Sequence, residues 1–125
     1  MEISNKNVIV TGGANGIGKA LAKAFKNAGA SYILIADLDE TEGQKTADEL
    51  GIKFKKTDVS NESDLIELIS TANNDAQSID IFCSNAGIGG APMLLDVSTE
   101  DWQKIWEINV MSHIYACLFY TSPSP

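Results

Sequence analysis

One stretch near the start of the chain decides its fold: Asn7-Val8-Ile9-Val10-Thr11-Gly12-Gly13-Ala14-Asn15-Gly16-Ile17-Gly18. Its first five residues are mostly β-branched, which predicts a short buried strand over 7–11, and glycines follow at once. Apolar residues then recur at helical spacing, so one face of the next helix is predicted to hold Ile17, Leu21, Ala24, Phe25 and Ala28. The stretch therefore predicts a strand, a glycine-rich turn and a helix that ends at Gly29.

The same alternation of strand and helix continues along the chain. Strands are predicted over 31–36, 53–56 and 79–84, because each is a short run bounded by turn residues. A solvated helix is expected to stop at Gly51, and Ser98 is expected to begin a last helix that runs to about Cys117. Between them, Ser60 is expected to cap a helix whose apolar stripe is Leu65, Leu68, Ile69 and Ala72.

Strands that alternate with helices and are buried on both faces indicate an α/β fold of the Rossmann type, a doubly wound parallel sheet. Right-handed crossovers predict the strand order 3-2-1-4. A ligand is expected beyond the carboxyl ends of the strands, where the order reverses between the first strand and the fourth.

Composition narrows the classes of partner and site. Seventeen acidic residues against nine lysines, with no arginine, leave a net charge of -8, so we expect neither nucleic acid nor an anionic membrane as a partner. The apolar runs are too short to span a bilayer, and the polar start lacks the pattern of a signal peptide. Two cysteines make no disulfide framework, so we expect a cytoplasmic protein. The single histidine, His113, has no ligand cluster around it in the sequence, and no metal site is predicted.

The turn after the first strand is the first candidate binding site. Glycines in this turn would leave a pyrophosphate free access to the N–H groups at the N-terminus of the next helix. The spacing departs from the commoner G-x-G-x-x-G pattern, and the alternative is an ordinary tight turn between strand and helix. The candidate residues in this turn are Thr11, Gly12, Asn15, Gly16, Ile17 and Gly18.

An acidic residue, Asp37, is predicted at the end of the second strand. A carboxylate there can accept hydrogen bonds from the ribose hydroxyls of an adenosine and would repel a 2′-phosphate. Because Leu38 follows and the chain has no arginine, the sequence predicts NAD in preference to NADP. The alternative is a simple solvated turn acid.

Two further motifs follow the third and fourth strands. Asp58-Val59 and Asn85-Ala86-Gly87 put small or hydrogen-bonding residues where the adenine edge and the second ribose would lie. Turn chemistry is the alternative for Asn85 and Gly87.

Asn109 is a polar amide within an apolar helical stripe. It shares one predicted face with Trp102, Ile105, Trp106 and His113. A buried amide must find hydrogen-bond partners, so the alternative to a catalytic role is a structural amide that bonds a neighbouring strand. His113 is expected to be partly exposed or in the core, and not catalytic.

Together these residues resemble the short-chain dehydrogenase/reductase family over residues 3 to about 117. The resemblance is carried by Thr11-Gly12-x-x-x-Gly16-x-Gly18, Asp37, Asp58-Val59, Asn85-Ala86-Gly87 and Asn109-Val110. It implies that the glycines lie at the pyrophosphate, Asp37 at the adenosine ribose, and Asn85 at the nicotinamide side. It also implies that Asp58 and Val59 lie at the adenine, and that Asn109 is the catalytic asparagine that holds a proton-relay water. The implied activity is hydride transfer between NAD and a secondary alcohol or carbonyl substrate, in a full-length form that is a homo-oligomer.

The family also uses a serine and a Tyr-x-x-x-Lys pair. No tyrosine of this chain has a lysine four positions later. We therefore expect the chain to be the N-terminal part of an NAD-dependent oxidoreductase, with little or no activity by itself. The alternative is a non-catalytic dinucleotide-binding or sensing module.

The chain is expected to hold one dinucleotide-binding domain over 1–117. Residues 118–125 close on Thr121-Ser122-Pro123-Ser124-Pro125, which breaks a helix and resembles a translated sequencing adapter. We expect this tail to be non-native; a genuine truncated product is the alternative. The apolar strand over 79–84 is expected to be left as an open edge that promotes aggregation.

Overall fold

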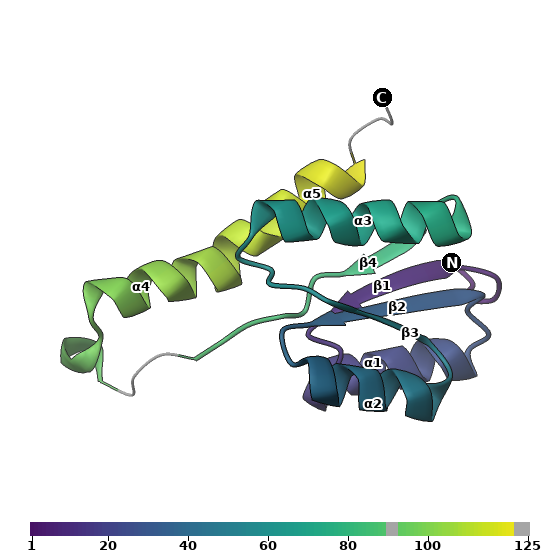
Figure 1. Ribbon diagram of the computed structural model, residues 1–125, viewed down its shortest axis with the longest axis horizontal. Helices are drawn as coiled ribbons and strands as arrows, with labels where there is room; N and C mark the ends of the chain where they lie inside the picture. The colour runs from purple at the N-terminus through teal and green to yellow at the C-terminus, as the bar shows by residue number, and fades with distance from the viewer. Residues whose placement is uncertain (90–92, 122–125) are drawn as a thin grey trace.

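A computed structural model describes residues 1–89 and 93–121, and shows one parallel sheet between two layers of helices (Figure 1). The strands are β1 (Asn7–Thr11), β2 (Tyr32–Asp37), β3 (Lys53–Lys56) and β4 (Ile81–Cys83). Their order is β3-β2-β1-β4 and every pairing is parallel, which confirms the predicted fold class and strand order. β4 is shorter than the predicted strand over 79–84.

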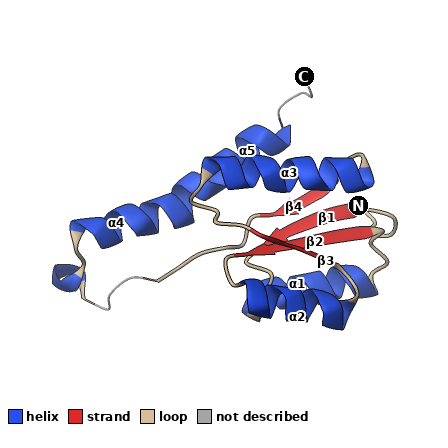
Figure 2. Ribbon diagram, in the orientation of Figure 1, coloured by secondary structure: helices blue, strands red, loops and turns tan. Residues whose placement is uncertain are grey.

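Helices cover both faces of the sheet, whereas α4 (Thr99–Trp106) extends beyond it (Figure 2). α1 (Gly16–Asn27) and α2 (Glu40–Leu50) cover one face, while α3 (Glu62–Ala76) and α5 (Ser112–Thr121) lie over the other. Before α5 come a short 3-10 helix (Leu94–Asp96), α4 (Thr99–Trp106) and a π-helical turn (Glu107–Met111). Among the described residues, no helix is both long and apolar enough to cross a membrane.

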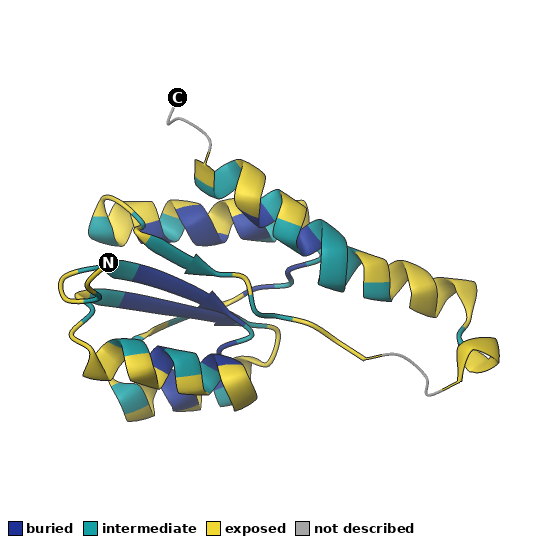
Figure 3. Ribbon diagram, turned by 180° about the vertical axis from the view of Figure 1, so that it is seen from behind, coloured by how far each residue is buried: buried dark blue, intermediate teal, exposed yellow. Residues whose placement is uncertain are grey.

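Alternate residues of the central strands feed two separate cores. Val8 and Val10 of β1 pack with Ala22 of α1 on one face, whereas Ile9 packs with Leu65 and the rest of the α3 stripe on the other. This is the period-2 alternation of a strand buried on both faces. The central strands are therefore the most deeply buried part of the molecule (Figure 3). The predicted stripe of α3 is confirmed, since all four of its residues are buried.

The predicted face of α1 is wrong in part. Gly18 and Ala22 are the buried residues of this helix, whereas Ile17 is 74% exposed and Ala24 and Ala28 are exposed as well. The reason is the close approach of α1 to the turn that precedes it, because only a residue without a Cβ fits at position 18. Ile17 is turned away from the sheet and toward the cleft described below.

The helix ends confirm two expectations and correct a third. Gly51 follows α2 in the left-handed conformation, and Ser98 caps α4 in a capping box with Asp101. The cap of α3 is Asn61, not Ser60: the Asn61 side chain accepts a hydrogen bond from the Asp64 N–H at 3.3 Å. The Ser60 hydroxyl donates instead to Asp58 Oδ1 at 2.6 Å.

The last helix extends beyond its expected end near Cys117 and continues to Thr121. Phe119 and Tyr120 pack against the core, and the Tyr120 hydroxyl donates to the carbonyl of Ile79 at 3.1 Å. The helix can continue because no proline occurs between residues 112 and 122. Residues 122–125 of the predicted tail lie outside the described residues.

One tyrosine joins β2 to the helix layer above it. The hydroxyl of Tyr32 donates to Asp75 Oδ2 of α3 at 2.7 Å. Burial, followed by this hydrogen bond and the charge of Asp75, raises the pKa of Tyr32 well above its usual value.

Candidate functional site

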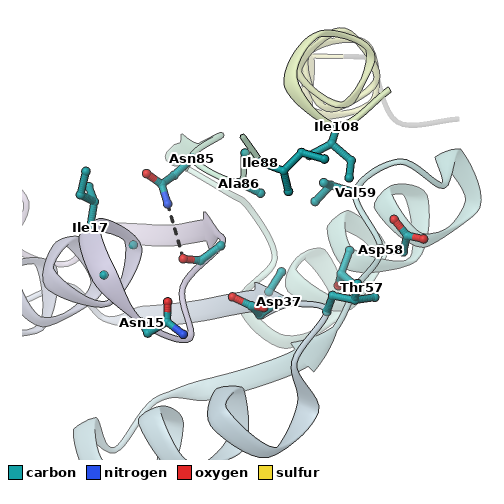
Figure 4. Close-up of a pocket in the computed structure, with 16 residues that line it drawn as sticks. Asn15, Ile17, Asp37, Thr57, Asp58, Val59, Asn85, Ala86, Ile88 and Ile108 are labelled. Atoms are coloured by element: carbon teal, nitrogen blue, oxygen red, sulfur yellow. Dashed lines mark hydrogen bonds between the residues drawn. The ribbon is translucent and has the colours of Figure 1, made fainter. Parts of the chain in front are cut away.

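A cleft of about 420 Å³ lies at the carboxyl ends of the strands, at the predicted edge of the sheet. Its walls come from the turn after β1, the ends of β2 and β3, the loop after β4, and the π-helical turn (Figure 4). Most of the predicted site residues meet here. They are Gly12, Asn15, Gly16, Ile17, Gly18, Asp37, Leu38, Asp58, Val59, Asn85, Ala86 and Gly87.

The glycine-rich turn is shaped by contacts that a Cβ would prevent. A Cβ on Gly18 would lie 1.9 Å from the carbonyl oxygen of Gly12, and one on Gly12 would lie 3.0 Å from the Cα of Ala86. Gly16 has a φ of 59°, which side-chain-bearing residues rarely adopt, and the space above its Cα is open. The turn is therefore packed tightly against Asn85 and Ala86 in the loop after β4, whereas at Gly16 it is open toward the cleft.

The N-terminus of α1 differs from those of the helices that follow. Asn15 is its N-cap residue, yet its side chain makes no capping hydrogen bond. By contrast, Asp39, Asn61 and Ser98 cap α2, α3 and α4 with their side chains. The first N–H groups of a helix carry partial positive charge and attract anions. The one uncapped end among these four opens into the cleft, where Gly16, Ile17 and Gly18 line the wall.

Asp37 ends β2, as predicted, and its half-buried carboxylate lies in the cleft. Its Oδ2 accepts a hydrogen bond from the N–H of Ala14 at 3.1 Å, and its Oδ1 accepts one from the N–H of Asp39 at 3.0 Å. Each carboxylate oxygen can accept a further hydrogen bond. Asp37 therefore holds the glycine-rich turn and remains able to accept from a ligand.

Asn85 and Thr11 join the ends of β4 and β1 beneath the cleft. The Asn85 amide donates to the carbonyls of Thr11 and Gly12 at 3.1 and 3.4 Å, the second of which is drawn in Figure 4. The Thr11 hydroxyl accepts from the N–H groups of Asn85 and Ala86 at 3.0 and 3.2 Å. Thr11 is 1% exposed and does not line the cleft, so its place is structural: it ties the two strands together.

Asp58 lines the cleft, but it also makes several hydrogen bonds to other residues of the protein. Its Oδ1 accepts from both the N–H and the hydroxyl of Ser60, at 3.0 and 2.6 Å, and its own N–H donates to Asp64 Oδ2 at 2.9 Å. Val59 beside it is 8% exposed and forms an apolar part of the wall.

The structure holds Asn109 in a structural contact. Its Oδ1 accepts from the N–H of Ile88 at 2.9 Å, and its Nδ2 donates to the carbonyl of the same residue at 2.8 Å. Asn109 is only half-buried, and neither it nor Val110 lines the cleft. The side-chain amide therefore ties the π-helical turn to the loop after β4, not to a neighbouring strand, and the catalytic role of Asn109 stays a prediction.

The stripe on which Asn109 was predicted is not a buried face: its two tryptophans are exposed and its other residues are half-buried. Trp102 and Trp106 are 50% and 53% exposed. His113 is half-buried, and its Nδ1 forms a hydrogen bond with the Ser84 hydroxyl at the end of β4. No group of three or more histidine, cysteine or acidic side chains in the described parts of the chain could hold a metal ion.

Four residues of the cleft wall were not singled out from the sequence. Ala36 and Thr57 are at the ends of β2 and β3, so their positions beside the predicted Asp37 and Asp58 could have indicated them. Ile88 lies in the loop after β4 and is bonded by Asn109, the neighbour of Ile108, and no local pattern encodes this contact between distant residues. These four residues are Ala36, Thr57, Ile88 and Ile108.

Comparison with known proteins decides the family. The model of the short chain dehydrogenase family matches residues 6–121, nearly the whole chain. This chain belongs to the short-chain dehydrogenase/reductase family. A short chain aldehyde dehydrogenase of Euphorbia lathyris is 32% identical over 120 residues, which cover 91% of this chain and 41% of the relative. An L-rhamnose 1-dehydrogenase (NADP(+)) of Thermoplasma acidophilum is 33% identical over a match that covers 92% of this chain and 47% of the relative.

Solved structures of the short-chain dehydrogenase/reductase family match the fold closely. A family member from Burkholderia phymatum, in complex with NAD, has a TM-score of 0.92 and 27% identity, covering 96% of this chain and 44% of its own. A 3-ketoacyl-(acyl-carrier-protein) reductase from Brucella melitensis, complexed with NADH, has a TM-score of 0.88 and 29% identity. The match covers 91% of this chain and 48% of the reductase chain. The chain thus spans less than half the length of these relatives.

Proposed function

We propose that this chain binds NAD in the cleft and supplies the cofactor-binding part of an NAD-dependent oxidoreductase that acts on an alcohol or carbonyl substrate. The proposal is carried by one observation: the uncapped N-terminus of α1 and the carboxylate of Asp37 open into the same cleft. A dinucleotide has a pyrophosphate for the first and ribose hydroxyls for the second.

The residues present fit this cofactor. The turn from Gly12 to Gly18 leaves open space above Gly16, where a Cβ meets nothing within 4 Å, and the N–H groups of α1 begin there. Val59 offers an apolar wall for an adenine, and Asn85 lies across the cleft from Asp37 (Figure 4). When bound, NAD would accept a hydride from an alcohol substrate, and NADH would donate one to a carbonyl substrate.

Asp37 favours NAD over NADP. Its negative charge would repel a 2′-phosphate, and none of the described lining residues is a lysine that could neutralise one. The relatives include proteins whose names carry either cofactor, so this preference rests on the residues of the cleft and not on the family.

Calorimetric titration of the chain with NAD and NADP tests the proposal. We expect NAD to bind more tightly, and Asp37→Asn to lower NAD affinity because a hydrogen bond to a charged group contributes about 1.5–3 kcal/mol. That loss corresponds to a decrease of roughly 10- to 150-fold. The same substitution should reduce the difference in affinity between NAD and NADP, because it removes the negative charge that would repel the 2′-phosphate of NADP.

Asp39→Asn is the matched control. It removes the same charge two positions away, does not alter a described residue of the cleft wall, and keeps an oxygen that can cap α2. We expect this variant to bind both cofactors as the unmodified chain does. Equal affinity of the unmodified chain for NAD and NADP would contradict the proposed preference, and absence of binding by either would contradict the proposed function.

A further inference from the structure

Thr46 of α2 makes a hydrogen bond outside its own helix. It is 1% exposed, and its hydroxyl donates to the carbonyl oxygen of Ala14 at 2.5 Å. Threonine within a helix often bonds the carbonyl four residues earlier, as Thr71 does with Glu67 at 2.8 Å. The Thr46 hydroxyl instead reaches the glycine-rich turn, 32 positions earlier in the chain.

The close packing of α2 on the sheet makes this contact possible. A Cβ on Gly43 would lie 2.0 Å from Cε1 of Phe54 in β3, so only glycine allows the helix to lie this near. Thr46 follows three positions later, and residues at that spacing share one face of a helix. The face that packs on the sheet therefore also presents the Thr46 hydroxyl to Ala14.

Ala14 is held on both sides of its Cα. Its N–H donates to Asp37 Oδ2 at 3.1 Å, and its carbonyl accepts from Thr46. Because Ala14 is 1% exposed, its carbonyl depends on this hydroxyl for a hydrogen-bond partner. Each described peptide bond is trans, and in a planar trans peptide the C=O and the following N–H point in opposite directions. With the Ala14 carbonyl directed at α2, the N–H of Asn15 points away from α2, and Asn15 lines the cleft.

We propose that Thr46 is a positioning residue for dinucleotide binding: it orients the Ala14–Asn15 peptide so that the Asn15 N–H joins those of α1 in receiving the pyrophosphate. The inference rests on the proposed function. Thr46 is buried beneath the turn and does not line the cleft, so its effect on a ligand would pass through the turn. Loss of the hydroxyl would leave the Ala14 carbonyl unpaired and free the peptide to rotate toward water.

The experiment compares Thr46→Val, which keeps the shape and removes the hydroxyl, with Thr46→Ser, which keeps the hydroxyl. Thr71→Val, which removes a hydroxyl that bonds only within α3, is the matched control. Calorimetry measures the affinity of each folded protein for NAD and for adenosine, which has no phosphate. We expect Thr46→Val to weaken NAD binding roughly tenfold, Thr46→Ser to restore it to within about twofold, and adenosine affinity to stay unchanged.

A second measurement on the unmodified chain stands even if Thr46→Val does not fold. Titration with inorganic pyrophosphate, followed by amide NMR, should shift the Asn15 N–H together with those at the start of α1. An unmoved Asn15 N–H would overturn the proposal, as would equal NAD affinity in Thr46→Val or an equal loss for NAD and adenosine. Failure of the unmodified chain to bind NAD at all would instead contradict the proposed function itself.

Discussion

Replacement of Gly18 by alanine tests whether the close packing of the glycine-rich turn holds the fold together. The added Cβ would lie 1.9 Å from the Gly12 carbonyl oxygen and 2.8 Å from Nδ2 of Asn85. An ordinary C···O contact is about 3.3 Å, so α1 and the turn must separate by roughly 1.4 Å. Because the nearest atom is backbone, no side-chain rotation can relieve the overlap.

The expected size of the effect follows from two opposing contributions. Overpacking costs up to about 3 kcal/mol, while alanine gains up to about 1 kcal/mol over glycine in a helix. The net loss is then about 2 kcal/mol, which lowers the urea midpoint by about 1 M if the dependence on urea is about 2 kcal/mol per M.

Urea unfolding followed by circular dichroism measures this shift, and Gly89→Ala is the matched control. A Cβ at Gly89 meets nothing within 4 Å, so its unfolding free energy should change by less than about 0.5 kcal/mol. Calorimetry should also show weaker NAD binding for Gly18→Ala, because the shifted turn carries the N–H groups of α1. Equal midpoints for the two variants would refute the packing argument.

Two further predictions concern the core and its pH dependence. Leu68→Ala should lower the free energy of unfolding by about 2–5 kcal/mol, because Leu68 is 0% exposed. Ile66 is on the same helix but is 45% exposed, so Ile66→Ala should change this free energy far less. The same urea experiment measures both variants. The pKa of Tyr32 is raised in the folded chain, so its contribution to stability is fully present below the unfolded pKa near 10 and falls as pH rises above that value. Urea midpoints between pH 8 and 11 should therefore fall less steeply for Tyr32→Phe, and parallel profiles would contradict this account.

Local patterns predicted most of the architecture correctly. The strands, their order and the end of α2 at Gly51 follow from β-branched runs, glycine positions and the alternation of strand with helix. The errors lie where two local choices were nearly equal. Ser60 and Asn61 are both good caps, and the contact of Ser60 with Asp58 decides between them. The apolar spacing of α1 suggested Ile17 for the core, but the glycine at 18 turned that side chain outward.

Local patterns also predicted part of the candidate site, while the rest depends on tertiary contacts. Gly12, Asp37 and Asn85 could be predicted because each lies at or just after the carboxyl end of a strand, and parallel strands bring these ends to one edge of the sheet. The family resemblance predicted Asn109 as the catalytic asparagine, and this role stays a prediction; the structure shows its amide bonded to the backbone of Ile88. This contact depends on the path of the loop after β4, which no periodic pattern in the sequence describes.

The sequence alone determined the family, the sheet and the edge of the sheet where the cleft lies, because these depend on residue types at short, regular spacings. Only the tertiary structure decided which of the predicted site residues line the cleft and which bond to other parts of the protein. The contacts responsible join residues far apart in the chain: Thr11 with Asn85 across 74 positions, and Ala14 with Thr46 across 32. Such pairs form only once helices and strands have packed, so no local pattern records them.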